Sequence, residues 1–158
     1  MNTESLPPPT RQPRVNYRTA SPLVLPAMLA LQQAVNRCGL EPALLELVKL
    51  RASQINRCAF CIEMHSREAK QAGERDDRLH LLSAWEESGV FTAREQAALR
   101  WTETLTRLAD REVSDEIFEE VRAEFSEAEL TNLTLAIVAI NGWNRFSVGF
   151  RVPPRFAG

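Results

Sequence analysis

The chain has 158 residues, of which 44% are hydrophobic and 25% charged, a balance typical of one folded globular domain. Its formal net charge of -2 excludes the strongly basic character that favours a nucleic-acid partner. No apolar run approaches the ~20 residues that cross a bilayer, so the sequence also predicts no membrane partner.

The first element is a proline-rich arm over residues 1–22, where the prolines prevent a lasting helix. Val15 and Tyr17 give this arm some apolar surface, and we expect it to lie on a neighbouring subunit. The apolar residues that follow Arg18 resemble a signal peptide only superficially, because Pro22 and Pro26 interrupt them. We therefore expect a cytoplasmic protein with one helical domain over residues 23–158.

Helical periodicity dominates the domain, and no strand pattern is evident. The sequence predicts an all-α bundle of about six to eight helices. Their expected ranges are 25–37, 42–54, 58–73, one ending near 89, 92–108, 114–125 and one beginning at 126.

Several of these helices have recognisable ends. Thr92 with Glu95, and Ser126 with Glu129, are capping boxes, in which each side chain satisfies the other residue's backbone N–H. Pro42 suits a first helical turn. The last helix is apolar nearly all round, which predicts that it is buried.

The two cysteines Cys58 and Cys61 are separated by two residues, and His65 follows four residues later. At ~100° per residue, all three share one face of a helix. Cys58 and Cys61 can close a disulfide within one turn, and His65 can accept a proton from Cys61. A helix N-terminus favours the thiolate, the form that attacks peroxide oxygen or disulfide sulfur. This pattern indicates a thiol redox centre.

Two other interpretations of the cysteines remain open. A CxxC pair can be half of a zinc site, but the chain contains only two histidines and three cysteines, which makes a four-ligand site hard to build. The cysteines could also be inert core residues. Glu46 lies among leucines, and a carboxylate buried there needs a partner such as His65. Cys38 has no partner in sequence and is interpreted as structural, and His80 as a surface residue.

The stretch from Glu46 to His65 reads ELVKLRASQINRCAFCIEMH. It resembles the core motif of the alkylhydroperoxidase D and carboxymuconolactone decarboxylase superfamily, in which a Glu precedes CxxC and a His follows it by four residues. A looser similarity continues through residues 91–106 and 141–145.

The resemblance implies an AhpD-like helical fold and a homo-oligomer, either trimer or hexamer. It implies a thiol-dependent peroxidase of antioxidant defence, with no metal or other cofactor. Cys61 would be the peroxidatic nucleophile and Cys58 the resolving cysteine, with His65 and Glu46 relaying the proton. The partners would be a hydroperoxide substrate and a dithiol electron donor, such as a lipoyl or thioredoxin-like protein.

Two features complicate this assignment. The helix dipole argument favours Cys58 as the more acidic thiol, whereas the register with His65 favours Cys61 as the nucleophile. Phe60 also stands where the best-known alkylhydroperoxidase D members carry a further histidine. The alternative functions are a lyase that uses Glu46 and His65, as in the decarboxylase branch, and a redox sensor whose disulfide switches the oligomeric state.

Overall fold

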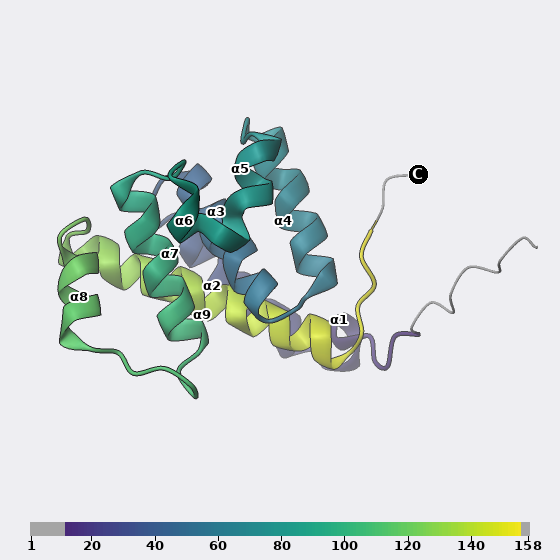
Figure 1. The fold of residues 1–158 in the computed structure, drawn as a ribbon. Helices are drawn as coiled ribbons and strands as arrows, with labels where there is room; N and C mark the ends of the chain where they lie inside the picture. Colours follow the sequence, from purple (N-terminus) through teal and green to yellow (C-terminus); the bar gives the residue numbers. More distant parts are fainter. Residues whose placement is uncertain (1–11, 156–158) are drawn as a thin grey trace, which may run out of the picture.

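The computed structural model describes residues 12–155, and over these residues the chain is helical throughout, with no strand. Figure 1 shows α9 running along the molecule, with α4, α5 and α6 above it, α8 at one end and α1 near the other. The elements are α1 (Tyr17–Ala20), α2 (Val24–Asn36), α3 (Pro42–Ile55), α4 (Ala59–Gln71), α5 (Asp76–Leu81), a 3-10 turn η1 (Leu82–Ala84), α6 (Trp85–Ser88), α7 (Ala93–Thr106), α8 (Asp115–Arg122) and α9 (Glu127–Gly149).

The predicted all-α fold is confirmed. The described residues contain nine α-helices rather than six to eight, because the chain adds short pieces. The helix predicted to end near Gly89 is divided into α5, η1 and α6, and α1 is a four-residue turn within the predicted arm. None of the helices over residues 12–155 is both long and apolar enough to cross a membrane.

The core is arranged around α3, which packs against α4, α7 and α9. One side of α3 places Leu44 and Val48 in an apolar cluster with α2, α7, α8 and α9. Its other side places Leu47 and Leu50 in a second cluster with α4, α5 and Trp85. Full burial of one such side chain contributes about 1.5–3 kcal/mol. A helix buried on both sides is therefore a fixed support for the residues that it carries.

The predicted helix starts are confirmed, whereas α4, α7 and α8 end two or three residues before the predicted 73, 108 and 125. Both capping boxes are present, with Thr92 accepting the N–H of Glu95 and Ser126 accepting the N–H of Glu129. Pro42 is at the start of α3. These contacts are local, so they set the first residue of each helix independently of tertiary packing.

The last helix is only partly buried. Leu133, Ile137 and Ile140 are at most 2% exposed, whereas Val138 is 54% exposed. The prediction of burial all round was wrong for this outer stripe, because successive residues turn by ~100° and the core covers one side of α9.

Both described ends of the chain meet at the C-terminal end of α9 (Figure 1). Tyr17 is buried and stacks on Phe146 of the same chain, with ring centroids 5.0 Å apart, and Arg14 N–H donates to the Phe150 carbonyl. Residues 1–11 of the predicted arm lie outside the described residues. Contact between the arm and a neighbouring subunit stays a prediction.

A buried carboxylate, Glu103 of α7, joins three elements. It accepts hydrogen bonds from the Trp85 indole at 2.8 Å and from Arg51 Nε at 2.7 Å, and Arg111 lies 3.6 Å away. Burial alone would raise the pKa of Glu103, but the bonds from Trp85 and Arg51 outweigh it and lower this pKa.

We expect Glu103→Gln to lower the free energy of unfolding by about 3 kcal/mol, because the substitution leaves Arg51 as a buried charge without its partner. Urea denaturation followed by circular dichroism measures the change. Glu119→Gln, at an exposed position on α8, is the matched control and should lie within about 0.5 kcal/mol of wild type. Equal stability of the two variants would contradict a structural role for the carboxylate.

Candidate active site

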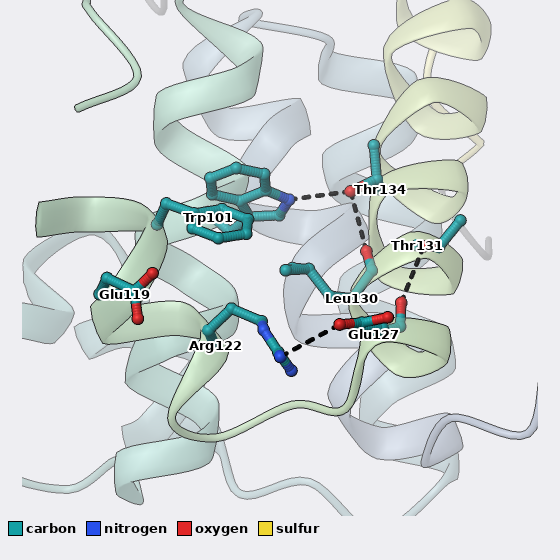
Figure 2. Close-up of a pocket in the computed structure, with 8 residues that line it drawn as sticks. Trp101, Glu119, Arg122, Glu127, Leu130, Thr131 and Thr134 are labelled. Atoms are coloured by element: carbon teal, nitrogen blue, oxygen red, sulfur yellow. Dashed lines mark hydrogen bonds and ion pairs between the residues drawn. The ribbon is translucent and has the colours of Figure 1, made fainter. Parts of the chain in front are cut away.

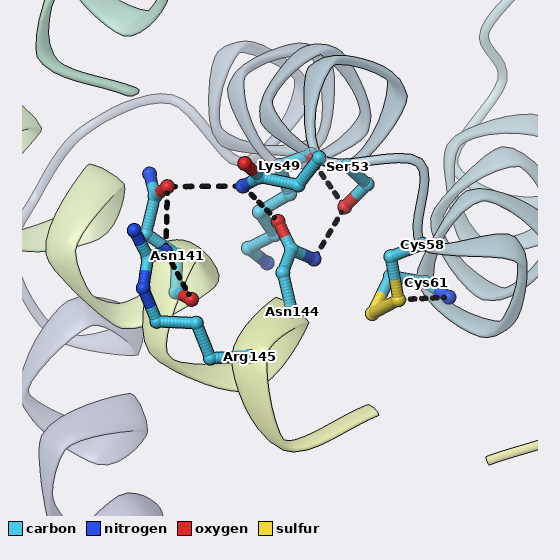
Figure 3. Close-up of a disulfide and its surroundings, with 8 residues drawn as sticks. Lys49, Ser53, Cys58, Cys61, Asn141, Asn144 and Arg145 are labelled. Atoms are coloured by element: carbon cyan, nitrogen blue, oxygen red, sulfur yellow. Dashed lines mark hydrogen bonds between the residues drawn. A yellow bond between two sulfur atoms is a disulfide. The ribbon is translucent and has the colours of Figure 1, made fainter. Parts of the chain in front are cut away.

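The centre of the site is a disulfide between Cys58 and Cys61, whose Cα atoms are 5.3 Å apart (Figure 3). Cys58 is the N-cap of α4, and its sulfur accepts the backbone N–H of Cys61 at 3.3 Å. Each cysteine is only 1% exposed. The disulfide predicted from the spacing is therefore present, at the first turn of α4.

The turn from α3 to α4 brings the disulfide to this place. The N–H of Cys58 donates to the Ser53 carbonyl at 3.0 Å, and the N–H of Arg57 donates to the Gln54 carbonyl at 3.2 Å. This pair of bonds is a Schellman motif, in which the residue at the Arg57 position is usually glycine because its backbone is left-handed. Arg57 has a φ of 54°, a conformation that costs a side-chain-bearing residue roughly 1–2 kcal/mol.

A network of amide side chains fixes the same turn to α9 (Figure 3). Asn56 donates to the side-chain oxygens of both Asn141 and Asn144 at 2.9 Å. Asn144 in turn donates to the Ser53 hydroxyl at 3.0 Å, and that hydroxyl donates to the Lys49 carbonyl at 2.7 Å. Asn144 and Ser53 are almost fully buried, so their polar groups are satisfied by one another, by the Asn56 side chain and by the backbone.

A histidine with two carboxylates lies on the other side of the disulfide. His65 Nδ1 is 3.1 Å from Glu46 Oε2 and 3.3 Å from Glu68 Oε2. Because both partners are hydrogen-bond acceptors, Nδ1 carries a proton and Nε2 is left for exchange. Lys49, one turn beyond Glu46, reaches Glu46 Oε1 at 2.7 Å.

The electrostatics of this cluster favour a charged pair. Burial would lower the pKa of His65, but the hydrogen bonds to Glu46 and Glu68 outweigh it, so this pKa is raised above the usual value. Burial would likewise raise the pKa of Glu46, yet its bonds with His65 and Lys49 lower it. At mildly acidic pH the pair is therefore imidazolium and carboxylate.

Cys61 and His65 line the same cavity, which has a volume of about 320 Å³. Leu25, Leu29 and Trp143 make much of its wall apolar. Arg18 and Lys49 supply cations and Glu68 a carboxylate. An apolar space with a few converging polar groups is the usual form of a small-molecule site.

The structure brings together all four residues that the sequence singled out: Cys58, Cys61, His65 and Glu46. Lys49 and Glu68 were not predicted from the sequence, although each stands three residues from a predicted site residue, a spacing that puts two side chains on one helical face. Trp143 of α9 also lines the Cys61 cavity.

Among the described residues, Glu46, His65 and Glu68 are the one set of potential ligands gathered closely enough for a metal ion, with ligand atoms within 4.8 Å of one another. The cysteines are outside this set and are bonded to each other, so the zinc interpretation of the CxxC pair finds no support in their geometry. Lys49 already occupies one oxygen of Glu46, and a cation there would have to displace it.

A larger cavity, of about 640 Å³, lies between α7, α8 and α9, far along α9 from the disulfide. Figure 2 shows its walls, where the Trp101 indole donates to Thr134 and Arg122 pairs with Glu127. Neither a thiol nor a histidine lines it. Volume alone therefore does not identify the reactive site in this chain.

Comparison with known proteins supports the assignment of the fold. The Carboxymuconolactone decarboxylase family model matches residues 22–104. The uncharacterized protein YdfG of Bacillus subtilis is 36% identical over 135 residues, which are 85% of this chain and 92% of YdfG.

Two solved structures are also similar. ATU0492 of Agrobacterium tumefaciens, a protein of unknown function proposed to be the antioxidant defence protein AhpD, gives a TM-score of 0.90 at 43% identity and covers 92% of this chain and 100% of its own. An uncharacterized peroxidase-related protein of Silicibacter sp. TM1040 gives a TM-score of 0.73 at 19% identity, covering 82% of this chain and 69% of its own, and shows the shared fold alone.

We expect the Glu46–His65 pair to stabilise the protein most between about pH 4.5 and 6.5, the usual pKa values of the two groups. The raised pKa of His65 contributes stability below 6.5, which is lost as the pH rises through its folded-state pKa. The lowered pKa of Glu46 contributes stability above 4.5, which is lost as the pH falls through its folded-state pKa.

Glu46→Gln tests this expectation. The stability difference from wild type should be greatest within that window and shrink on either side, and NMR titration should show a lower His65 pKa in the variant. A difference independent of pH would mean that the pair acts through packing alone.

Proposed function

The chain belongs to the carboxymuconolactone decarboxylase family, and we propose that it acts as a thiol-dependent peroxidase that reduces alkyl hydroperoxides in antioxidant defence. The observation that carries the proposal is the shared cavity of Cys61 and His65, next to a disulfide that links Cys61 to Cys58. A nucleophile, a proton carrier and a resolving thiol are the three groups that the reaction needs.

In the proposed reaction, the Cys61 thiolate attacks the terminal oxygen of the hydroperoxide and the O–O bond breaks. Cys61 becomes a sulfenic acid, and the alkoxide that leaves takes a proton to become an alcohol. The Cys58 thiol then attacks the Cys61 sulfur, which forms the disulfide and releases water. Two electrons pass from the cysteine pair to the peroxide.

His65 supplies the proton in this scheme. Glu46 and Glu68 hold Nδ1, so Nε2 exchanges the proton with Cys61 and with the leaving alkoxide. The raised pKa of His65 makes the imidazole a stronger acceptor of the thiol proton and pairs the thiolate with an imidazolium. We assign Cys61 the peroxidatic role because it shares the cavity with His65, although the N-terminal dipole of α4 also favours a Cys58 thiolate.

A dithiol donor would return the disulfide to two thiols. We place this cycle in the cytoplasm, where thiol systems are kept reduced. We also propose that the protein is a homo-oligomer, a trimer or hexamer, in which exposed apolar residues such as Leu29 and Val138 are covered by another copy.

The function is tested by peroxide turnover with cumene hydroperoxide and a panel of dithiol donors. We expect turnover by wild type and by Cys38→Ser, since Cys38 is free and outside the site. Cys61→Ser should abolish turnover, and Cys58→Ser should stop after one oxidation, with a sulfenic acid that dimedone traps on Cys61. A lyase would survive both cysteine substitutions, and a sensor would be oxidised once without turnover.

We expect His65→Ala to slow oxidation of Cys61 by peroxide about 100-fold, the scale of losing a positioned acid–base group. Stopped-flow oxidation of the reduced protein measures the rate. His80→Ala, at an exposed histidine, is the control and should retain the wild-type rate. Alkylation rates of Cys61 that follow the same pH curve in His65→Ala and wild type would show that His65 only fills space.

A further inference from the structure

The disulfide has a second cavity on its other side. Cys58, and not Cys61, lines a space of about 440 Å³ between the start of α4 and the residues that follow α9. Val148, Val152, Pro153 and Pro154 make much of its wall apolar. Among the described residues, those that line it include Arg57 and Arg151 and no carboxylate.

Phe60 and Ser147 line both this cavity and the one that contains His65, and thus stand between the two. Phe60 is 6% exposed and packs with both cysteines, against Met64 and Val152. The residue found where related proteins were expected to carry a histidine is therefore part of an apolar partition. The two cysteines of one disulfide therefore line different cavities.

The two arginines of the second cavity share an unusual backbone. Arg151 follows α9 in the same Schellman motif that places Arg57 after α3: Val152 N–H donates to the Ser147 carbonyl at 2.9 Å and Arg151 N–H to the Val148 carbonyl at 3.3 Å. Arg151 has a φ of 56° and Arg57 a φ of 54°, and they are the two non-glycine residues with positive φ in the described part of the chain.

Glycine would fit both positions without strain, and the chain uses it elsewhere. Gly73 follows α4 in the same pair of bonds, with a φ of 96°. Strained side-chain-bearing residues gather at functional sites, where the side chain is needed. Arginine in place of glycine at both helix ends beside Cys58 indicates that two positive charges are required there.

We propose that this cavity is the entry site of the reductant, an aliphatic dithiol that carries a negative charge, and that the reductant attacks Cys58 while peroxide reacts at Cys61. This proposal rests on the proposed function in one respect only, the identification of peroxide as the oxidant of Cys61. Apolar walls suit an aliphatic chain, and the two arginines suit an anionic group on it. Since each cysteine is only 1% exposed, the thiol must arrive on a slender chain rather than on a flat protein surface.

A thiolate of the reductant attacks the Cys58 sulfur, the bond between Cys58 and Cys61 breaks, and its electron pair leaves with Cys61 as a thiolate in the His65 cavity. The second thiol of the reductant, after losing its proton, attacks the reductant sulfur now bonded to Cys58. The reductant closes to a disulfide and Cys58 leaves as a thiolate, which the Cys61 N–H stabilises and which then takes a proton.

The test measures reduction of the purified disulfide form in single turnover, without any peroxide. Dihydrolipoate and dihydrolipoamide are the probes, because they share one aliphatic dithiol and differ by one negative charge. The variants are Arg57→Gly and Arg151→Gly, singly and together. Arg37→Ala, at the end of α2, is the matched control, since Arg37 is exposed and does not line this cavity. Thiol release is followed by alkylation and mass spectrometry at low and high salt.

We expect wild type to react faster with dihydrolipoate, and the double variant to lose about fivefold or more of that rate while its rate with dihydrolipoamide stays within about twofold. High salt should remove the wild-type preference. The melting temperature should be unchanged or higher, because glycine relieves the strain at positive φ. Equal loss with both probes, or no loss with either, would overturn the charged entry site.

The point of attack is tested separately with the anionic monothiol 2-mercaptoethanesulfonate. Acid quenching followed by tandem mass spectrometry should locate the mixed disulfide on Cys58. A mixed disulfide on Cys61 would overturn the two-cavity assignment. The site of the mixed disulfide is measured without peroxide, so it does not depend on peroxidase activity. Failure of the proposed function would be seen only in the peroxide assay.

Discussion

The tight turn between α3 and α4 is the constraint on which the rest of the site depends. Three residues, Asn56 to Cys58, reverse the chain, and the Schellman bonds leave no freedom in how α4 leaves α3. Glu46 and His65 are 19 residues apart in sequence, yet they meet at 3.1 Å because α3 ends and α4 begins at this turn. The amide network from Asn56 to α9 holds the same turn from outside, so the site is positioned by packed helices and buried hydrogen bonds rather than by a loop.

Much of this arrangement could be predicted from the sequence. Periodicity gave the helices, the capping residues gave their ends, and the CxxC-x3-H spacing put two thiols and an imidazole on one face. These signals are local, and local geometry of a helix is nearly independent of the rest of the molecule. The residues that the sequence did not reveal, such as Asn144 and Trp143, act across α9, and no local pattern reports which residue of a distant helix will face the turn.

The exposure of the outer stripe of α9 and the environment of Phe60 are two further features that could not be predicted from the sequence. Apolar character alone does not tell whether a side chain enters the core, separates two cavities or stays exposed. Val138 and Ile137 are neighbours of similar chemistry, but one is 54% exposed and the other 2%. Their difference is set by the rotation of α9 against α2, α3 and α7, which is a property of the assembled bundle.

The continuous 23-residue helix α9 has a consequence for how this chain can vary in length. It contributes to the core through Ile137, to the turn through Asn144 and to both cavities through Ser147, in a fixed angular register. One inserted residue would rotate everything beyond it by ~100° and separate these groups from their partners. Natural length variation should therefore be confined to segments such as 107–114 between α7 and α8, while α9 accepts exchanges of side chains but no change in its number of residues.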